Sequence, residues 1–536
     1  MEDNQFVSEE LFFHVDEESD NLDQSDDHHD SSSINDGESS IHDYGSSVVF
    51  DGPQSYSEQW PKSYKETTDS ISIAASPSGL NLLKQAQNIT QSIHQSITNL
   101  SLHDVEAKSP LLILHDKSKE QSDSTITLSN YNFTKISEQN IPYGCSVTQT
   151  VFNGFSVFVG IGLLSVPSTI EHGGWASMGL LPLYAGICMF TSYLITRCMQ
   201  HNKCIITFPD LGEAAFGNYG RVFVSIIFYI ELYFSCVEFI ILEADNSAKL
   251  FPNASFHWGD FYLSPVHFLG IVTALIVLPI CYLRDFRKIS FISAGGVIGV
   301  ACIAFSLILV GVTEDIGFHQ NGPLVKWNGL PYALGVFGFC YSGHSVLPNL
   351  YHSMSNKNNF LKAMAIIFVL SLSIYFLVAI SGFLMFGEDT NSQVTLNLPA
   401  NVSPTTITLW MTVLSPLFKY PLLLNPLARS LEELLPPHLS NSWWCIIPLR
   451  TTLVASSVCV AFLVPFFGYV MAFAGSLLCI LTSIVVPTLV YIKLFRNLSL
   501  TEMTTCYAVV WMGFFVAMFG TYSSVCNIIR SYQHNP

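Results

Sequence analysis

Long apolar stretches separated by short polar loops fill the chain from residue 145 to residue 530. A bilayer core about 30 Å thick needs roughly 20 apolar residues for each helical crossing. On that template the pattern predicts eleven membrane-spanning helices, with limits near 145–170, 176–199, 220–243, 265–283, 289–312, 331–353, 361–386, 404–427, 449–467, 470–494 and 505–528. The division between the ninth and tenth spans, near Phe467, has the weakest polar signal. The predicted fold class is therefore an all-α polytopic membrane protein.

The first and sixth stretches contain the same interruption. Gly162 to Pro167 and Gly343 to Pro348 each run from a glycine to a proline five residues later. Both residue types weaken a helix. Matching breaks in two halves of a membrane protein are typical of secondary transporters, whose substrate binds where the helices break. Chance is the alternative, because Gly and Pro are common in membrane helices.

The two breaks lie 181 residues apart, which predicts two five-helix repeats at 145–312 and 331–494, followed by an extra helix at 505–528. Units with an odd number of spans have opposite orientations in the membrane, so the arrangement is a 5+5 inverted repeat. Twelve Lys and Arg residues fall in loops on the side of the N-terminal tail and three on the other side. This bias predicts a cytosolic N-terminus. The sequons at Asn253 and Asn401 then fall on the opposite side, where glycosylation is possible.

Residues 1–140 differ from the transmembrane transporter domain predicted at 141–530. The first 70 residues contain 19 Asp and Glu but two Lys, in a chain whose net charge is -18. A segment this acidic buries too little apolar surface to fold alone, so we predict a disordered cytosolic tail. Its charge argues against nucleic-acid binding. All 13 cysteines follow the tail without a C-x-x-C pair, so we expect neither a metal site nor a disulfide framework.

The break in span one frees backbone amides and carbonyls, which can bind the carboxylate and ammonium groups of an amino acid. Close packing through small residues is the alternative interpretation of its glycines. In span six, hydroxyl side chains lie beside the second break. The predicted substrate-binding residues are therefore Gly160, Ile161, Gly162, Leu163, Tyr341 and Ser342. We expect His344 to be a hydrogen-bonded core residue in preference to a proton carrier.

Charged residues inside the predicted spans are the candidates for coupling. Glu231 and Glu238 lie seven residues apart and so on one helical face. Carboxylates within a membrane are costly and indicate function, and either can take up a proton because apolar surroundings disfavour the charge. A buried pair that only fixes helix packing is the alternative. Lys419 in span eight can act as a fixed cation, or its side chain can snorkel to the interface.

Signatures of soluble enzymes are absent from the sequence. It contains no Walker A loop, H-E-x-x-H or G-x-S-x-G motif. We therefore predict that the protein is not an enzyme or a nucleotide-driven pump, and that it needs no cofactor.

Several motifs resemble the amino acid/auxin permease family. They are Asn153-Gly154, the segment Gly160 to Pro167, the His172-Gly173-Gly174-Trp175 turn and Glu231-Leu232-Tyr233. Within that family, the acidic tail and Lys419-Tyr420 resemble the AVT group of vacuolar amino-acid transporters of plants and yeasts. The resemblance covers about residues 140–530, while the tail contributes composition alone.

The resemblance implies an eleven-helix LeuT-like core, proton-coupled amino-acid transport and the vacuolar membrane. It also implies that the break around Gly160 and Gly162 contacts the substrate backbone. In sodium-coupled relatives, spans one and eight supply ion ligands. Asn153 and Ser415 lie in similar regions here, while Lys419 nearby favours a proton-driven cycle.

The sequence therefore predicts a proton-coupled secondary transporter that moves amino acids across the vacuolar membrane by alternating access. A neutral substrate is expected because the spans contain no excess of one charge. The plasma membrane is the alternative location. The alternative function is an amino-acid sensor whose acidic tail signals to a cytosolic partner.

Overall fold

The computed structural model describes residues 60–65, 67–68, 144–283, 295–314, 316–400, 402–436, 439 and 442–534. Most of the predicted tail and the sequon residue Asn401 lie outside these ranges. The described residues all belong to one unit, Pro53–Pro536.

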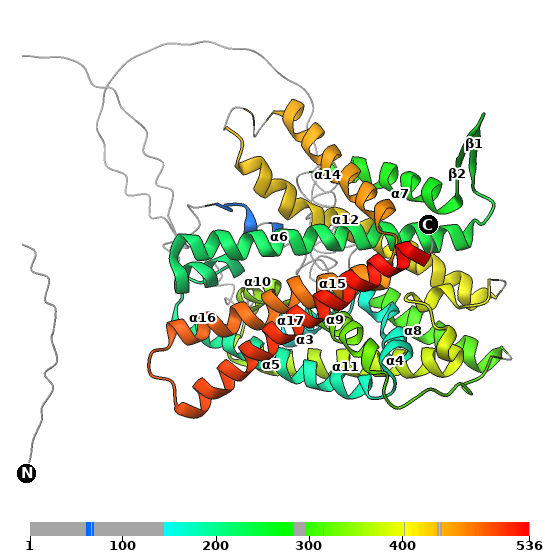
Figure 1. Ribbon diagram of the computed structural model, residues 1–536. Coiled ribbons are helices and arrows are strands. Elements are labelled where there is room, and N and C mark those ends of the chain that lie inside the picture. The colour runs from blue at the N-terminus through cyan, green and yellow to red at the C-terminus, as the bar shows by residue number, and fades with distance from the viewer. Residues whose placement is uncertain are drawn as a thin grey trace, which may run out of the picture. The chain divides into compact units, whose positions relative to one another are not determined.

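Helices make up nearly all of the described structure and follow the predicted spans in order (Figure 1). They are α3 (Val147–Phe158), α4 (Val166–Gly173), α5 (Ser177–His201), α6 (Phe208–Leu250), α7 (Pro265–Cys281), α8 (Gly295–Thr313), α9 (Leu330–Cys340), α10 (Leu347–Ser353), α11 (Phe360–Phe386), α12 (Ser403–Glu433), α14 (Trp443–Leu463), α15 (Phe467–Ala474), α16 (Val486–Leu494) and α17 (Leu500–His534). Strands β1 (Phe256–Trp258) and β2 (Phe261–Leu263) form an antiparallel hairpin in which Phe256 pairs with Leu263.

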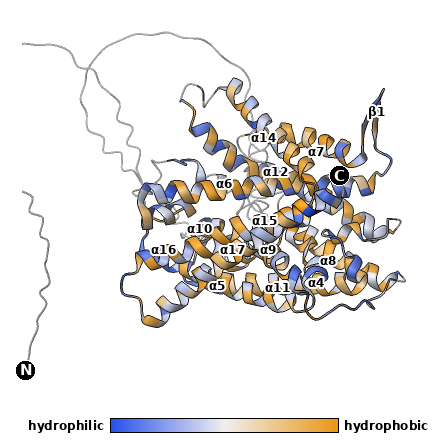
Figure 2. Ribbon diagram, in the orientation of Figure 1, coloured by the Kyte–Doolittle hydropathy of each residue, from blue (hydrophilic) through white to orange (hydrophobic). Residues whose placement is uncertain are grey.

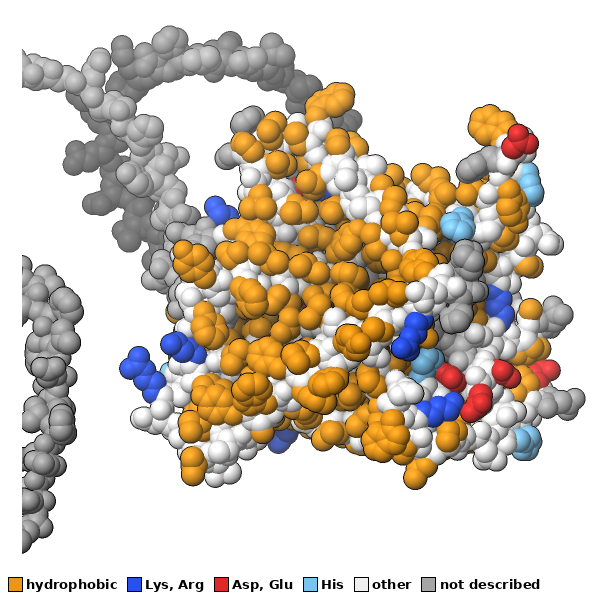
Figure 3. All heavy atoms as spheres, in the orientation of Figure 1, with side chains coloured by type: hydrophobic (Ala, Val, Ile, Leu, Met, Phe, Trp, Pro, Cys, Tyr) orange, Lys and Arg blue, Asp and Glu red, His pale blue; other side chains and the backbone are white. Residues whose placement is uncertain are grey.

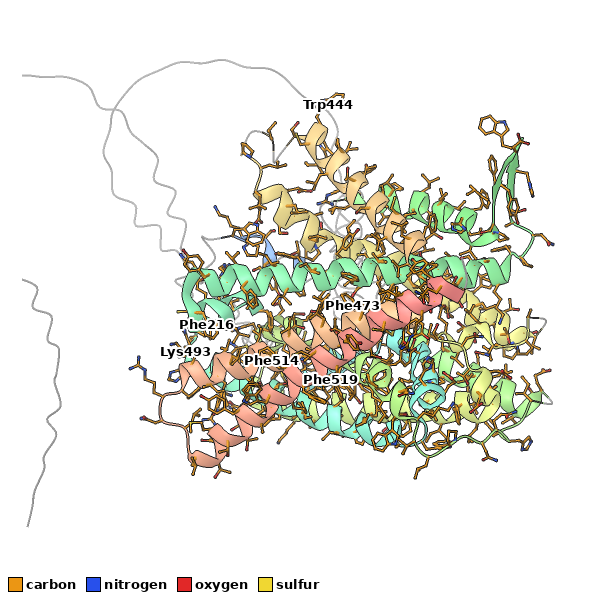
Figure 4. The ribbon with its side chains drawn as sticks, viewed as in Figure 1. Phe216, Trp444, Phe473, Lys493, Phe514 and Phe519 are labelled. Carbon is orange, nitrogen blue, oxygen red and sulfur yellow. The ribbon has the colours of Figure 1, made fainter. Side chains whose placement is uncertain are left out.

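The helices carry the apolar surface that a bilayer requires. Seven helical segments of the described chain are long and apolar enough to cross a membrane, and α7 and α8 are shorter apolar helices. Hydrophobic residues dominate the middle of the helices (Figure 2), and on the face in Figure 3 they form a broad belt with most charges toward its two ends. Phe514 and Phe519 project from the outer side of α17 (Figure 4). The all-α membrane fold is confirmed.

The two predicted breaks are present and give the fold its inverted symmetry. Span one consists of α3 and α4 joined by a 3-10 turn at Ile161–Leu164, and span six consists of α9 and α10 joined by a 3-10 turn at His344–Val346. The broken helices run antiparallel. The start of span one meets the end of span six, where the Cys145 amide donates to the Ser353 carbonyl over 2.7 Å. The 5+5 inverted repeat is therefore observed at its two central helices.

The helical domain has two ends, which we call the tail end and the hairpin end. The tail end is where Cys145 meets Met354 and where residues 60–65 and 67–68 lie; the hairpin end is where β1 and β2 lie. Helix α6 runs from the tail end to the hairpin end, and α12 runs back between the same ends.

The third span is longer than the sequence predicts. Helix α6 has 43 residues because a short initial helix continues into the main one across Gly217, whose φ of 66° favours glycine. A Cβ on Gly212 would lie 2.5 Å from the Gly220 carbonyl oxygen, so the initial helix folds closely against the main one. Asp210 fixes this corner, since its carboxylate accepts from the Thr207 amide over 2.7 Å and from Arg221 over 2.5 Å.

The tenth span contains π-helical turns between α15 and α16, at Gly475–Cys479 and Leu481–Val485. Such wide turns often occur at functional sites. The span also contacts α9 backbone to backbone, because a Cβ on Gly475 would overlap the Gly335 carbonyl oxygen.

The ninth span begins at Trp443, six residues earlier than predicted, so Arg450 lies inside α14. Its buried guanidinium donates to Glu432 over 2.7 Å, to the Cys281 carbonyl over 2.5 Å and to Asn425 over 3.2 Å. One side chain thereby joins α14, α12 and the end of α7. Each of its contacts neutralises or satisfies a group that would be costly to bury alone.

Candidate functional site

A cavity of about 140 Å³ lies where the two broken helices meet α6 and α12. We call it the central cavity. Its backbone lining comes from both breaks, and its apolar lining includes Phe228, Phe239 and Leu422. Glu231 of α6 and Lys419 of α12 are the charged residues that line it. The sequence-predicted residues Gly160, Ile161, Gly162 and Ser342 also line the cavity.

The break in span one leaves donors available to a ligand. Among the described residues, the amides of Gly160, Ile161 and Gly162 donate no hydrogen bond, whereas those of Leu163 and Ser165 close the 3-10 turn. A Cβ at Gly160 would meet nothing within 4 Å, so this position opens onto free space. Gly162 serves a different purpose, because a Cβ there would lie 2.8 Å from Cys340 Sγ. The first glycine gives access and the second lets the two breaks approach.

Tyr375 of α11 connects the two breaks. Its hydroxyl lies 2.7 Å from the Phe158 carbonyl oxygen at the end of α3 and 3.0 Å from the Cys340 carbonyl oxygen at the end of α9. Both carbonyls lack a helical partner because the helices stop there. Tyr375 also lines the central cavity. It therefore holds the interrupted backbones together beside the space where a ligand fits.

Glu231 is largely buried, at 6% exposure, and lies in a polar part of the cavity wall. The Thr482 hydroxyl, the Cys479 thiol and the Ser342 hydroxyl face its carboxyl group. Thr482 and Cys479 belong to the π-helical turns of span ten. The widened helix thus presents polar groups to an intramembrane carboxylate.

Lys419 lies between the central cavity and a small adjoining cavity of about 30 Å³. Leu163 and Ser415, two further sequence-predicted residues, line this second cavity. Within the described part of the chain, the Lys419 ammonium has no ion-pair or hydrogen-bond partner. A cation without a partner at the edge of a cavity can attract the carboxylate of a ligand.

Three sequence-predicted residues lie outside both cavities. The Tyr341 ring is buried against Phe368 and Tyr375, with ring centroids 5.9 and 5.7 Å away. Asn153 of α3 is buried with neither side-chain atom hydrogen-bonded. Glu238 of α6 is fully buried, and neither of its oxygens has a hydrogen-bond partner. The structure therefore groups Glu231 and Lys419 at one site and separates Asn153 and Glu238 from it.

His344 is a core residue in this structure. Its Nε2 lies 3.0 Å from Thr191 Oγ1, 3.1 Å from Ser192 Oγ and 3.0 Å from the Cys188 carbonyl oxygen, all on α5. These contacts fasten the second break to α5, which is the hydrogen-bonded role expected from the sequence.

A larger cavity of about 590 Å³ lies toward the hairpin end, and Asp245, Glu171 and Tyr332 line it. Beside it, the loop before α12 is fastened to α6. The Lys249 ammonium donates to the carbonyls of Thr395, Leu396 and Leu398 over 2.6 to 2.9 Å. One ammonium group thereby ties the loop to the end of α6.

The sequence did not identify Tyr375, Thr482 or Cys479. A lone tyrosine in the very apolar α11 is a signal for Tyr375, but its partners are known only from the fold. Thr482 and Cys479 reach Glu231 through a π-helical geometry that has no clear residue pattern.

One family model and two relatives that match this chain are all described as amino acid transporters. Residues 144–526 match the family model described as "Transmembrane amino acid transporter protein". The chain is 35% identical over 511 residues to Amino acid transporter AVT1C of Arabidopsis thaliana, covering 91% of this chain and 92% of that protein. It is 37% identical over 388 residues to Amino acid transporter AVT1I of the same plant, covering 72% of this chain and 96% of that protein.

Two solved structures match the chain at low sequence identity. The crystal structure of MhsT in complex with L-phenylalanine has a TM-score of 0.48 at 11% identity, covering 70% of this chain and 98% of that one. A Na⁺-coupled sialic acid symporter in a substrate-bound outward-open state has a TM-score of 0.42 at 12% identity, covering 71% and 88%.

Proposed function

This chain belongs to the transmembrane amino acid transporter family, and on that premise we propose that it is a proton-coupled secondary transporter. It moves neutral amino acids across the vacuolar membrane by alternating access and requires no metal or other cofactor. The observation that carries this proposal is the central cavity, where unpaired amides, one anion and one cation converge.

The lining of the cavity supports a zwitterionic substrate. The amides of the span-one break and Lys419 can bind a carboxylate, and Glu231 can bind an ammonium group. No unbalanced charge remains for a basic or acidic substrate side chain. A volume of 140 Å³ holds on the order of ten water-sized groups, which is the size of a small to medium amino acid. The apolar lining suits an uncharged side chain.

Three carboxylates on one face of α6 support proton coupling. Glu231, Glu238 and Asp245 lie at intervals of seven residues, about 10.5 Å of helix each. Glu231 lines the central cavity and Asp245 lines the larger cavity toward the hairpin end, with Glu238 buried between them. Side chains and water that bridge these intervals would give a proton a route between the two cavities.

The location follows from the resemblance to the AVT group and from the basic loops, which support a cytosolic tail end. Asn253 is exposed beside the hairpin, so the proposed orientation leaves it accessible to glycosylation. Loss of an electrophoretic shift in Asn253→Gln, with the protein isolated from its native membrane, would support that orientation.

Transport by the purified protein in liposomes tests the function. We expect labelled neutral amino acids to accumulate when a pH gradient is imposed in one direction, and a protonophore to abolish the accumulation. Replacing sodium by choline is expected to have no effect. Amino-acid flux that ignores the pH gradient would contradict proton coupling, and absence of flux for every amino acid would contradict transport.

Leucine in place of Gly160 is expected to block transport without unfolding the protein. The glycine Cβ position is open toward the cavity, so the larger side chain would occupy space that the substrate needs. We expect initial uptake to fall by about tenfold or more, which corresponds to roughly 1.4 kcal/mol of lost binding. The measurement is initial uptake in liposomes, with thermal unfolding in detergent measured in parallel.

Gly186→Leu is the matched control for that variant. Gly186 also has open space at its Cβ position, but it lies on the exposed side of α5. We expect it to transport at the wild-type rate. Equal loss of uptake in both variants would show that the effect comes from helix propensity and not from occupation of the cavity.

A further inference from the structure

A short piece of the N-terminal tail is folded against the helical domain. Trp60 donates from Nε1 to the Ser430 carbonyl of α12 over 2.7 Å. The amides of Lys62 and Ser63 each donate to one oxygen of the Glu433 carboxylate, both over 2.7 Å. We call residues 60–65 with 67–68 the docked segment. A carboxylate held by two backbone amides is a specific contact, because both oxygens must be aligned.

The docked segment also contacts α6 and α10. Arg221 of α6 donates from Nε to the Trp60 carbonyl over 3.0 Å. Asn349 of α10 donates to the Thr68 hydroxyl over 2.6 Å. With the contacts to α12, the segment connects three helices at the tail end. Its binding surface contains cationic, anionic and amide groups, each matched by a group of the segment.

Tyr64 brings the segment to the wall of the central cavity. Its side chain is 1% exposed, and its hydroxyl donates to the Ser345 carbonyl over 3.1 Å. Its ring centroid lies 5.3 Å from that of Phe228. Ser345 and Phe228 both line the central cavity. Tyr64 therefore covers the cavity wall on the side that faces the tail end.

We propose that the docked segment is a reversible plug that keeps the central cavity closed toward the tail end. A cavity opens at that end when α6, α10 and α12 move apart, and the segment bridges all three. The segment must therefore be released before the cavity can open at the tail end. The fraction of molecules with a released segment then sets the transport rate. The plug goes beyond the proposed function, although one of its two tests uses transport.

Hydrogen exchange of the full chain in detergent tests the plug without transport. In the wild type we expect slow exchange at the amides of Lys62 and Ser63. In Tyr64→Ala we expect faster exchange there and also at residues 343–345, the second break. The expected increase is about fivefold, the change in an equilibrium when one hydrogen bond is lost. Fast exchange at Lys62 and Ser63 in the wild type, or unchanged exchange at 343–345 in the variant, would overturn the proposal.

Uptake in liposomes is the second test, with Tyr64→Ala and Tyr64→Phe expected to transport faster than the wild type. Phenylalanine keeps the ring and loses the hydroxyl, so its effect should be the smaller. Tyr219→Ala is the control, since Tyr219 lies two residues after the Gly217 corner of α6 and is 91% exposed. Slower or unchanged uptake in both Tyr64 variants would overturn the plug. If no protein transports, the proposed function fails, and hydrogen exchange at 343–345 decides the plug separately.

Discussion

Glutamine in place of Glu231 is expected to nearly abolish pH-driven accumulation, while exchange of labelled for unlabelled amino acid continues at higher substrate concentrations, because an amide binds an ammonium group less tightly than a carboxylate does. Glutamine matches the size of glutamate and can hydrogen-bond to Ser342 and Thr482, but it cannot gain or release a proton. A carrier locked in the neutral form can reorient with substrate on both sides, yet it cannot use a proton gradient. We expect net uptake to fall roughly a hundredfold, the lower end of the effect of a positioned proton-transfer group in catalysis.

Two further variants identify the residue responsible. Glu238→Gln removes the buried carboxylate between the two cavities and is expected to slow pH-driven uptake without abolishing binding. Glu502→Gln, at the exposed start of α17, is expected to leave transport unchanged. Binding of labelled amino acid to the detergent-purified proteins separates coupling from recognition. If Glu231→Gln still accumulates substrate against a gradient, Glu231 is not the coupling residue.

Methionine in place of Arg450 is expected to destabilise the protein more than any other substitution proposed above. The guanidinium is 1% exposed and pairs with Glu432 while it also binds Cys281 and Asn425. Its removal breaks the buried ion pair with Glu432, a change that typically costs about 3–5 kcal/mol. The measurement is the free energy of unfolding or, where unfolding is irreversible, the temperature at which the detergent-purified protein loses its monodisperse elution peak.

A double variant shows whether the buried charge causes this loss. Arg450→Met with Glu432→Gln removes both charges, so we expect it to recover much of the stability. Lys493→Met is the control for the loss of a cation, since Lys493 is exposed at the end of α16 (Figure 4). If the double variant is less stable than Arg450→Met alone, the hydrogen bonds of Arg450 to α7 and α12 matter more than the ion pair.

The helices and both breaks could be predicted because their signals are local. Apolar length identifies a span, and Gly162, Pro167, Gly343 and Pro348 mark the breaks within six-residue windows. Boundaries were predictable where a loop is polar. At the start of α14 the apolar residues Trp443 and Trp444 belong to the helix. The predicted boundary lies too late because a charged residue such as Arg450 is typical of a loop.

The site could be predicted in part. Glu231 and Lys419 were identified because charges are rare inside a membrane, and Gly160 and Ser342 because they flank the breaks. Which side chains face the cavity depends on how each break turns the chain. Tyr341 and Ser342 are adjacent, yet the Tyr341 ring packs against α11 and Ser342 lines the cavity. In irregular backbone, the direction of each of two adjacent side chains is set by the fold and not by a repeating sequence pattern.

The docked segment was missed for a different reason. The first 70 residues are acidic overall, and a few aromatic residues change that composition little. Trp60 and Tyr64 are the local signal, since large aromatic residues are uncommon in segments that do not fold. Their binding surface is formed by three helices distant in sequence, so only the fold could show it.

The Tyr375 hydroxyl between the two breaks has fewer protons than it has acceptors. A phenol has one proton, and the Tyr375 hydroxyl lies within hydrogen-bond distance of two carbonyl oxygens, at 2.7 and 3.0 Å. At any instant it can donate fully to one of them. The ends of α3 and α9 therefore compete for the same donor, and the shorter distance favours the Phe158 carbonyl. Tyr375 therefore couples the two repeats through one donor that both broken helices need.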